Sequence, residues 1–372
     1  MKKRVLVSVT NDLTTDQRVK KVCNSLSNLG YDILLIGRVL PDSKPIERPY
    51  PILRMGLFFT KGALFYAEYN IRLFIVLLFS KVDIYHANDL DTLLANFLAA
   101  KIRRKPIVYD SHEYFTGVPE IQNKPFVKDI WLGIERWIFP KLKFIFTVNK
   151  SIAKLYKDEY GKELRIIRNI PLKQTISVYK SKAELGLPLD KQFIITQGTG
   201  INIDRGIEEA VEAMRYLPNV CFLIIGDGDI IPQLKERVKK LHLESQVIFK
   251  GRMPYSEMMQ YTHHADLGLT LDKDTNINYR FSLPNKLFDY IHAGIPVLST
   301  KVIEVKTIID TYTIGLFIDN HQPKHIADKI QLALGNNELK KNWILNIPKA
   351  QEELHWGHEE KGLKEVYSEI EN

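Results

Sequence analysis

Short apolar segments alternate with amphipathic helical segments along most of the chain, and this alternation restricts the fold more than any other feature. Residues 5–9 predict a buried strand, residues 16–29 a helix that ends at Gly30, and residues 33–36 a second strand. This order forms a βαβ unit, and its right-handed crossover makes the two strands parallel. The sequence therefore predicts an α/β fold with parallel sheets.

The alternation continues into the C-terminal part of the chain, which at 372 residues is long for one domain. Residues 172–190 are polar and contain proline and glycine, as expected of a hinge. We expect two doubly wound, Rossmann-like domains that face each other across a cleft. Their predicted bounds are residues 1–171 and 172–350, followed by a final helix over 351–372.

Charge is distributed unevenly between the two predicted domains. Residues 1–170 carry a net +11 and residues 171–372 a net −3. A basic first domain suits an anionic partner. No nucleic-acid motif is recognised, so nucleic acid is not an expected partner.

Aromatic and basic residues mix in residues 57–79 and 126–146. This mixture is typical of segments that lie on an anionic membrane, where Phe58, Phe59, Trp131 and Trp137 could insert. The alternative is two core helices with solvated rims. The longest uninterrupted apolar run, residues 73–79, is too short to cross a bilayer.

Targeting and redox features point to the cytoplasm. The N-terminal segment MKKRVLVSVTND reads as a first strand because its apolar run is too short for a signal peptide. The two cysteines, Cys23 and Cys221, lie in apolar runs far apart and predict neither a disulfide nor a zinc site. We expect a cytoplasmic protein, with the inner face of the membrane as a peripheral location.

The stretch LPNKLFDYIHAGIPV, residues 283–297, contains the start and the end of a short helix. Pro284 cannot continue a preceding strand, Asn285 is a good N-cap, and Gly294 ends the helix. A helix start offers unpaired backbone N–H groups and a partial positive charge, which suit a phosphate.

Two charged residues in this helix extend the prediction to a nucleotide. Lys286 adds a full positive charge in the first turn. Asp289 would repel a phosphate, but its carboxylate can accept hydrogen bonds from two adjacent ribose hydroxyls. The alternative is a capped helix with a lysine and an aspartate on its surface.

The loop GTGINIDRG, residues 198–206, is a second candidate for binding an anion. Its glycines, beginning with Gly198, let a ligand approach the backbone, and Arg205 can pair with a diphosphate through two hydrogen bonds. The spacing is neither a dinucleotide fingerprint nor a P-loop. The alternative is an exposed arginine near a helix start.

Polar residues follow several predicted strands of the first domain. They come from the segments after residues 9, 87 and 110, and the candidates are Asn11, Asn88, Asp89, His112 and Glu113. Carboxyl ends of parallel strands meet at one edge of a sheet, where open α/β folds bind ligands. The alternative for His112 and Glu113 is a cap on the following segment.

LPNKLFDYIHAGIPV resembles the donor-site signature of the family-4, or group 1, glycosyltransferases, and particularly those of bacterial surface-polysaccharide synthesis. The segments TNDLTTDQRVKKV, RNIP, FKGR and LHWGHEE also resemble parts of that family. The resemblance implies the GT-B fold and a retaining transferase. Its donor is a nucleotide sugar with UDP or GDP, and its acceptor a glycan or a lipid-linked molecule.

The resemblance also implies roles for individual residues. His112 and Glu113 are the catalytic candidates, and Asn11, Asn88 and Asp89 line the acceptor side. The implied donor-binding residues are Gly198, Arg205, Gly251, Arg252, Leu283, Pro284, Asn285, Lys286 and Asp289. The sequence departs from the family's Glu-x7-Glu pair, because Phe281 replaces the first glutamate and Asp289 the second.

We expect no cofactor and no metal. The motifs 227–229 and 272–274 both read Asp-x-Asp, but such a short pattern is weak, and GT-B enzymes commonly work without metal. Two other functions remain open at this point. One is a nucleotide-sugar 2-epimerase of the same fold, and the other is a non-catalytic sugar-nucleotide sensor.

Overall fold

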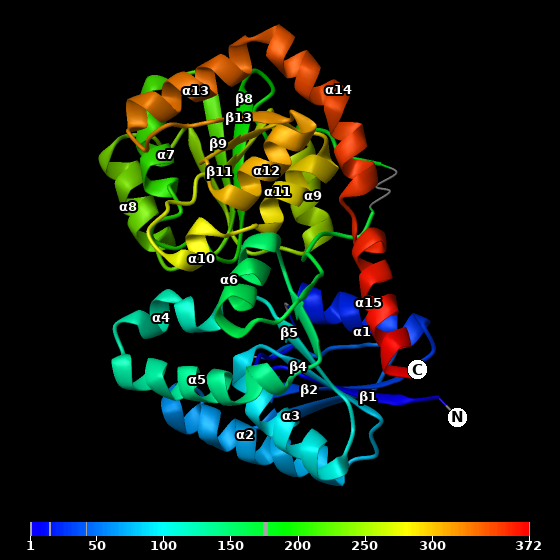
Figure 1. Ribbon diagram of the computed structural model, residues 1–372. Coiled ribbons are helices and arrows are strands. Elements are labelled where there is room, and N and C mark those ends of the chain that lie inside the picture. The colour runs from blue at the N-terminus through cyan, green and yellow to red at the C-terminus, as the bar shows by residue number, and fades with distance from the viewer. Residues whose placement is uncertain (1, 15, 42, 174–177, 372) are drawn as a thin grey trace. The chain divides into compact units, whose positions relative to one another are not determined.

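The computed structural model describes the chain except residues 1, 15, 42, 174–177 and 372, and it consists of two compact units (Figure 1). Unit 1 comprises Met1–Asn169 and Trp356–Asn372, and unit 2 comprises Ile170–His355. The divisions therefore follow residues 169 and 355, where the sequence analysis placed them after 171 and 350. Part of the predicted hinge, residues 174–177, lies outside the described residues, as does Thr15 in the loop after the first strand.

Unit 1 contains a seven-stranded parallel sheet in the order β3-β2-β1-β4-β5-β6-β7. Its strands are β1 (Arg4–Ser8), β2 (Asp32–Val39), β3 (Ile52–Gly56), β4 (Ile84–Asn88), β5 (Ile107–Ser111), β6 (Phe144–Thr147) and β7 (Arg165–Ile166). Its helices are α1 (Gln17–Asn28), α2 (Gly62–Phe79), α3 (Leu90–Arg103), α4 (Pro119–Gln122), α5 (Pro125–Ile138), α6 (Lys150–Tyr160) and α15 (Trp356–Glu371). Two short 3-10 helices are η1 (Phe115–Gly117) and η2 (Phe139–Lys141). The strand order reverses between β1 and β4, which makes this edge the expected ligand site.

Unit 2 contains a six-stranded parallel sheet in the order β10-β9-β8-β11-β12-β13. Its strands are β8 (Gln192–Gly198), β9 (Val220–Gly226), β10 (Val247–Lys250), β11 (Leu267–Thr270), β12 (Val297–Ser299) and β13 (Gly315–Phe317). Its helices are α7 (Ile207–Ala213), α8 (Ile231–Lys240), α9 (Tyr255–His263), α10 (Ile277–Arg280), α11 (Asn285–Ala293), α12 (Ile303–Tyr312), α13 (Pro323–Gly335) and α14 (Asn337–Glu353), with the 3-10 helix η3 (Met214–Tyr216). Here the strand order reverses between β8 and β11. The expected α/β class, with two parallel-sheet domains, is confirmed.

Helix α11 is held against its sheet by Tyr290. The Tyr290 hydroxyl lies 3.2 Å from the Ile195 carbonyl oxygen of β8 and 3.1 Å from the Leu269 carbonyl oxygen of β11, and it donates to these two strands. A Cβ on Gly268 would lie 2.3 Å from the Tyr290 ring, so only glycine lets the ring pack this closely on β11. This contact fixes α11 against the two central strands of the sheet.

The ends of α11 differ partly from the prediction. Gly294 ends the helix in the left-handed region with φ 79°, as its sequence position indicates. The N-cap is Pro284 rather than Asn285, and no side chain caps the helix. Proline fixes the extended backbone there, so Asn285 is already helical and the first N–H groups of the helix have no side-chain cap.

Helix α15 completes unit 1, although it follows unit 2 in sequence. The Trp356 indole donates to Ser25 Oγ at 2.8 Å, and the Tyr367 hydroxyl lies 2.8 Å from His86 Nδ1. Both aromatic residues are buried in the same core as β1 and α1. The C-terminal segment is therefore part of the first unit's core.

Helix α2 carries an exposed apolar side. Its buried residues Phe65, Tyr69, Leu73 and Leu77 are spaced four apart and pack into the core of unit 1. Within the described residues α2 is long and apolar enough to cross a membrane by length and composition. The uninterrupted apolar run of residues 73–79 underestimates the apolar length of this helix, because only two of its 18 residues are charged.

Candidate functional site

The nucleotide-binding candidates of unit 2 gather where the strand order reverses. Strands β8 and β11 are neighbours, and the loop that follows β8 carries Arg205, while Asp272 lies just beyond β11. Helix α11 starts after the same strand and brings Lys286 and Asp289. The sheet therefore brings together residues that are up to 84 positions apart, from Arg205 to Asp289.

Two of the predicted anion-binding residues contact one buried carboxylate. Arg205 Nη1 lies 2.6 Å from Asp272 Oδ2, and Lys286 Nζ lies 3.9 Å from Asp272 Oδ1. The Asp272 side chain is 1% exposed, whereas that of Arg205 is 22% exposed. Asp272 therefore holds two basic side chains beside the start of α11, which suits a diphosphate.

Only 11% of the Lys286 side chain is exposed. Burial lowers its pKa from the usual value, the Asp272 carboxylate opposes that shift, and the charge of Arg205 adds to it. The Arg205 guanidinium also stacks on the Tyr279 ring at 4.0 Å from the centroid. An anion that replaced part of the missing hydration would stabilise both cations.

Asp289 is buried, and the protein already uses both of its oxygens. The Tyr255 hydroxyl donates to Oδ1 at 2.8 Å, and Gln197 Nε2 donates to Oδ2 at 3.0 Å. Each carboxylate oxygen can accept a further hydrogen bond, so ribose hydroxyls can still be bound. Replacing Asp289 with alanine would take a hydrogen-bond partner from both Tyr255 and Gln197, so this change should lower stability as well as nucleotide binding.

Glycines permit the close approach of three loops beside this cluster. A Cβ on Gly226 would lie 1.8 Å from the Gly198 carbonyl oxygen, and one on Gly206 would lie 2.4 Å from that of Leu271. Gly198, Gly206 and Gly226 all have positive φ. The sequence indicated a glycine loop, and the structure shows that it packs against the ends of β9 and β11.

The remaining donor-binding candidates lie around the same sheet edge. Gly251 and Arg252 follow β10, which is the outer strand and two strands from β8, and both are exposed. Leu283, Pro284 and Asn285 form the approach to α11, and Asn285 is exposed. Phe281, at the position of the missing glutamate, is half-buried and ends α10.

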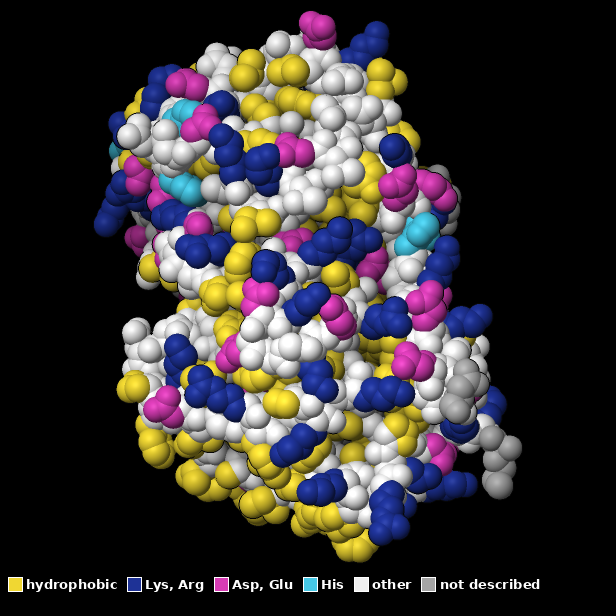
Figure 2. Space-filling view, in the orientation of Figure 1, with side chains coloured by type: hydrophobic (Ala, Val, Ile, Leu, Met, Phe, Trp, Pro, Cys, Tyr) yellow, Lys and Arg dark blue, Asp and Glu magenta, His cyan; other side chains and the backbone are white. Residues whose placement is uncertain are grey.

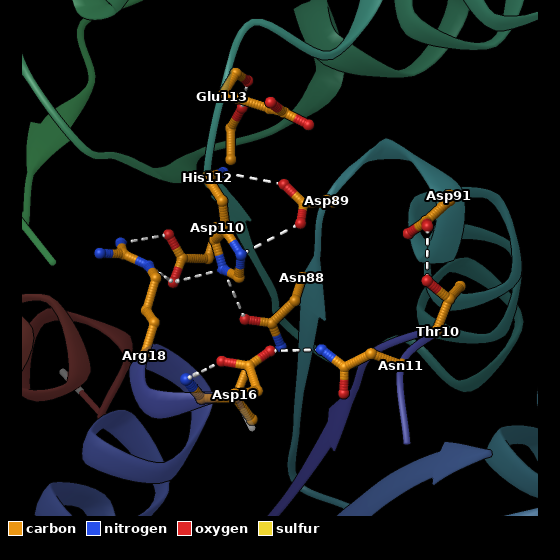
Figure 3. Close-up of polar contacts among 12 residues, drawn as sticks. Thr10, Asn11, Asp16, Arg18, Asn88, Asp89, Asp91, Asp110, His112 and Glu113 are labelled. Carbon is orange, nitrogen blue, oxygen red and sulfur yellow. Dashed lines mark hydrogen bonds and ion pairs between the residues drawn. The ribbon is translucent and has the colours of Figure 1, made fainter. Parts of the chain in front are cut away.

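His112 is the centre of a polar cluster in unit 1 (Figure 3). Its Nδ1 lies 3.0 Å from Asp89 Oδ2, and its Nε2 lies 3.2 Å from Asn88 Oδ1 and 3.6 Å from Asp110 Oδ2. The carboxylates of Asp89 and Asp110 raise the pKa of His112 well above its usual value against the effect of burial. Both ring nitrogens face acceptor oxygens, an arrangement that favours the imidazolium over a neutral ring that could act as a general base.

A second ion pair supports this cluster. Arg18 contacts the Asp110 carboxylate with two nitrogens, Nε at 3.0 Å and Nη2 at 2.6 Å, and both side chains are buried. Arg18 and His112 hold the pKa of Asp110 well below its usual value, although burial opposes this. The sequence pointed to His112 but assigned no role to Asp110 or to Arg18, because these two partners lie 92 positions apart.

The acceptor-side candidates differ in accessibility. Asn88 is fully buried and donates to the Ser8 carbonyl oxygen at 3.0 Å, so it positions His112 from within the sheet. Asp89 has φ 58° and accepts from the His112 backbone N–H at 2.8 Å. Asn11 Nδ2 donates to Asp16 Oδ2 at 2.5 Å, which fixes its loop. Glu113 is exposed, and its side chain points away from the imidazole in Figure 3.

Asp91, which the sequence analysis did not single out, is a buried acid beside this cluster. It accepts from Thr10 Oγ1 at 2.6 Å, while its Oδ1 has no hydrogen-bond partner among the described residues. Burial and the neighbouring Asp89 raise the pKa of Asp91 to about 7. The sequence of residues 86–91 could have indicated this buried acid, because it contains two aspartates only two residues apart.

The two Asp-x-Asp patterns have other contacts. Asp272 pairs with Arg205, and Asp274 with Arg280 at 2.9 Å. Across the part of the chain that the structure describes, no group of three or more histidine, cysteine or acidic residues could hold a metal ion.

Two family profiles match this chain, one for each unit. Residues 16–170 match Glycosyltransferase Family 4, and residues 178–350 match Glycosyl transferases group 1. The chain therefore belongs to the group 1, family 4 glycosyltransferases, as the signature stretch indicated.

Several curated relatives are glycosyltransferases. A 2-deoxystreptamine N-acetyl-D-glucosaminyltransferase of Niallia circulans is 23% identical over 68% of this chain and 67% of its own length. An N-acetyl-D-galactosaminyltransferase of Campylobacter jejuni, whose acceptor is named as a glycan on PP-undecaprenol, is 22% identical over 79% and 76%. A chitobiosyldiphosphodolichol beta-mannosyltransferase of Yarrowia lipolytica is 27% identical over 34% of this chain, which spans 28% of that relative's length.

Solved structures share the fold at low sequence identity. Sucrose-phosphate synthase from Thermosynechococcus elongatus aligns with a TM-score of 0.81 and 15% identity over 99% of both chains. Anabaena HepE in complex with UDP and glucose aligns with a TM-score of 0.75 and 14% identity over 99% of this chain and 100% of its own. This likeness confirms the GT-B class of the two domains.

Proposed function

We propose that this protein transfers a sugar from a nucleoside diphosphate donor to a hydroxyl of a glycan or lipid-linked acceptor. The observation that carries the proposal is the convergence of Arg205, Lys286 and Asp289 at the switch point of unit 2. Two cations and the start of α11 suit a diphosphate, and a carboxylate one turn later suits a ribose. The Anabaena complex with UDP and glucose supports a uridine nucleotide as the first donor to test, with GDP sugars as the second.

The proposed chemistry is the departure of a nucleoside diphosphate from the anomeric carbon. The bond from this carbon to the diphosphate oxygen breaks, and a bond to the acceptor oxygen forms. The acceptor hydroxyl gives its proton to the departing diphosphate oxygen, which leaves with the bonding pair. Arg205 and Lys286 stabilise the charge that develops on the leaving oxygen. These cations supply the charge that a metal ion supplies in other transferases, so we propose that none is required.

His112 is proposed to act as a fixed positive charge rather than to move a proton. Its imidazolium is held by Asp89, Asn88 and Asp110, and it remains a fixed cation at the switch point of unit 1. Retention of the anomeric configuration is proposed from the family membership, and Glu113 is the remaining catalytic candidate.

We propose that the acceptor is lipid-linked and that the protein acts at the inner face of the membrane in the assembly of a surface polysaccharide. The names of the Campylobacter and Yarrowia relatives, which specify undecaprenol and dolichol diphosphates, support the lipid. The net +11 of residues 1–170 supports an anionic membrane as a partner.

A nucleotide-release assay tests the proposed activity. Purified protein is incubated with UDP or GDP sugars, with and without lipid-diphosphate glycan acceptors, in the presence and absence of EDTA. We expect release of the nucleoside diphosphate that depends on the acceptor and is insensitive to EDTA. Donor conversion to a sugar epimer without an acceptor would indicate an epimerase instead, and binding without turnover would indicate a sensor.

A further inference from the structure

We propose that α2 is an interfacial helix that inserts its exposed apolar side into an anionic bilayer while the rest of unit 1 stays folded. This inference rests on the proposed membrane partner and deepens it. It names the docking element and predicts a component of binding that charge alone does not produce.

The exposed residues of α2 form a stripe without charge. Ala67, Ile71, Ile75 and Phe79 are spaced four apart and therefore lie along one side of the helix. Ile71 is 62% exposed and Phe79 is 79% exposed. A surface stripe of this kind usually marks an interaction site, because soluble proteins rarely leave a continuous apolar side in water.

The two charged residues of α2 do not interrupt this stripe. Glu68 accepts from the backbone N–H groups of Phe58 and Phe59 and pairs with Arg72 at 2.7 Å. Arg72 also lies over the Phe58 ring at 5.1 Å and donates to the Gly56 carbonyl oxygen. These contacts hold the preceding loop so that Phe58, which is 85% exposed, extends the apolar surface.

Neighbouring elements enlarge the same surface. Tyr66 of α2 packs edge-to-face on Trp131 of α5 at 5.2 Å, so the two helices are adjacent. Phe126 and Ile130 of α5 are exposed. Figure 2 shows hydrophobic side chains gathered along the lower edge of the view, over α2. Trp131 is only 7% exposed, so the prediction that it inserts is wrong.

Basic residues lie at both ends of the stripe, where they would meet lipid headgroups. Near the end of α2, Arg103 donates to the Leu78 and Ser80 carbonyl oxygens. The exposed basic residues around the two ends are Lys61, Lys81, Lys101, Arg104 and Lys124. An apolar stripe with a basic border matches an anionic bilayer better than a protein partner of either charge.

The buried side of α2 argues that it lies on the membrane and does not cross it. The Tyr69 hydroxyl donates to the Val9 carbonyl oxygen at 2.6 Å, and Asn70 Nδ2 donates to that of Asp91 at 2.8 Å. The Tyr85 hydroxyl donates to Leu77 at 3.0 Å. A spanning helix would lose these hydrogen bonds together with its core contacts, whereas an interfacial one keeps them.

Vesicle co-sedimentation of the full chain, without nucleotide, tests the inference. The vesicles are phosphatidylcholine alone and phosphatidylcholine with phosphatidylglycerol, each at low salt and at about 1 M salt, where the Debye length is about 3 Å. We expect strong binding to anionic vesicles at low salt, and a weaker part that persists at high salt and on neutral vesicles. If the protein were attracted by charge alone, no binding would remain at high salt or on neutral vesicles.

Substitution of the stripe separates α2 from the rest of the surface. Ile71→Glu with Ile75→Glu should lower vesicle partitioning at least tenfold at either salt concentration. Leu332→Glu with Leu345→Glu, exposed apolar residues of α13 and α14 in unit 2, is the matched control and should leave it unchanged. Thermal unfolding of each variant checks that the fold is retained.

Three results would overturn the inference. They are equal binding of wild type and the α2 variant, no binding of wild type to any vesicle, and a vesicle-free dimer that the α2 variant abolishes. The last would assign the stripe to self-association. Donor turnover with a soluble acceptor is measured on the same preparations, so a failure of the membrane inference is distinguishable from a failure of the transferase proposal.

Discussion

Arg205 and Asp272 form a 2.6 Å ion pair at the point where the sheet of unit 2 reverses its strand order. The pair holds the guanidinium beside Lys286 and the start of α11. Because Asp272 is buried, its charge cannot be hydrated when Arg205 is removed. The pair therefore links the stability of the fold to the site proposed for the leaving diphosphate.

Replacing Arg205 should lower turnover more than nucleoside binding. A charge-assisted hydrogen bond to the diphosphate contributes about 1.5–3 kcal/mol, so Arg205→Ala should lower kcat/KM at least about tenfold. Affinity for the nucleoside without phosphates should stay within about twofold. Steady-state kinetics and calorimetric titration measure the two quantities.

Two further variants make the Arg205 result decisive. Arg205→Lys keeps a charge near Asp272 and should retain the thermal stability that Arg205→Ala loses, but not the full activity. Arg280→Ala removes a nearby exposed arginine that pairs with Asp274, and it should leave kinetics unchanged. Equal losses for nucleoside and nucleoside diphosphate would show that Arg205 is structural.

Asp289 should be essential for binding the ribose. The effect of its replacement on stability should depend on the side chain that is introduced. Asp289→Asn keeps an acceptor for Tyr255 or Gln197 and should weaken nucleotide binding about tenfold or more with a small change in stability. Asp289→Ala leaves both partners unsatisfied and should also lower the free energy of unfolding by about 1–3 kcal/mol. Nucleotide titration and chemical unfolding provide the measurements.

The control for Asp289 is Asp274→Asn, which removes an exposed acid outside the buried network. It should change neither the nucleotide affinity nor the free energy of unfolding. Wild-type nucleotide affinity in Asp289→Asn would refute the assignment of this residue to the ribose.

The alternation of strands and helices, and the bounds of α11, were largely readable from the sequence. Apolar runs followed by glycine or polar residues marked most strands, and Pro284, Gly294 and Lys286 marked the start and end of α11. The edge strand β3 was missed because Ile52–Gly56 is short and includes an exposed leucine and an arginine. Buried central strands show a stronger apolar signal than edge strands do.

Partners within the site could not be predicted, because they depend on tertiary contacts between distant residues. Nothing local indicates that Tyr255 reaches Asp289, 34 positions away, or that Arg18 reaches Asp110. Trp131 illustrates the same limit, since an aromatic residue in a basic segment can face either the core or the solvent. The side it faces was decided by Tyr66 and Phe115, which pack on it at 5.2 Å.

His112 should remain protonated through neutral pH. Its folded pKa is raised, so the stabilisation from its carboxylate contacts is complete below its unfolded pKa of about 6.5 and is lost only as pH rises through the higher folded value. The pH profile of kcat/KM should therefore show no loss due to His112 near pH 6.5. Titration of the imidazole signals by NMR measures the pKa directly.

Asp89→Asn tests what holds the proton on His112. Removal of the carboxylate at 3.0 Å should lower the pKa of His112, and activity should then decline as pH rises between about 6 and 8. Asp83→Asn, which removes an acid paired with Lys105, is the control and should keep the wild-type profile. A wild-type His112 that titrates near pH 6.5 would contradict the charged state described above.

Glu135 should make the protein less stable as pH rises toward neutrality. Its side chain is buried in α5, Tyr160 donates to Oε1 at 2.7 Å, and Oε2 has no hydrogen-bond partner among the described residues. Burial raises its pKa to about 7, with a further contribution from the charge of Glu159. The native state therefore keeps this proton up to about pH 7, whereas the unfolded chain releases it near pH 4.5.

The unfolding free energy should accordingly fall between about pH 4.5 and 7 and then level off, with a contribution from Glu135 of about 3 kcal/mol. Asp91, with a similarly raised pKa, acts in the same window. Glu135→Gln retains the acceptor for Tyr160 but cannot ionise, so it should be more stable than wild type above pH 7 and nearly equal below pH 5. Urea unfolding across this range, with the exposed Glu244→Gln as control, measures the difference. A constant difference between Glu135→Gln and wild type at every pH would show that Glu135 does not titrate in this window.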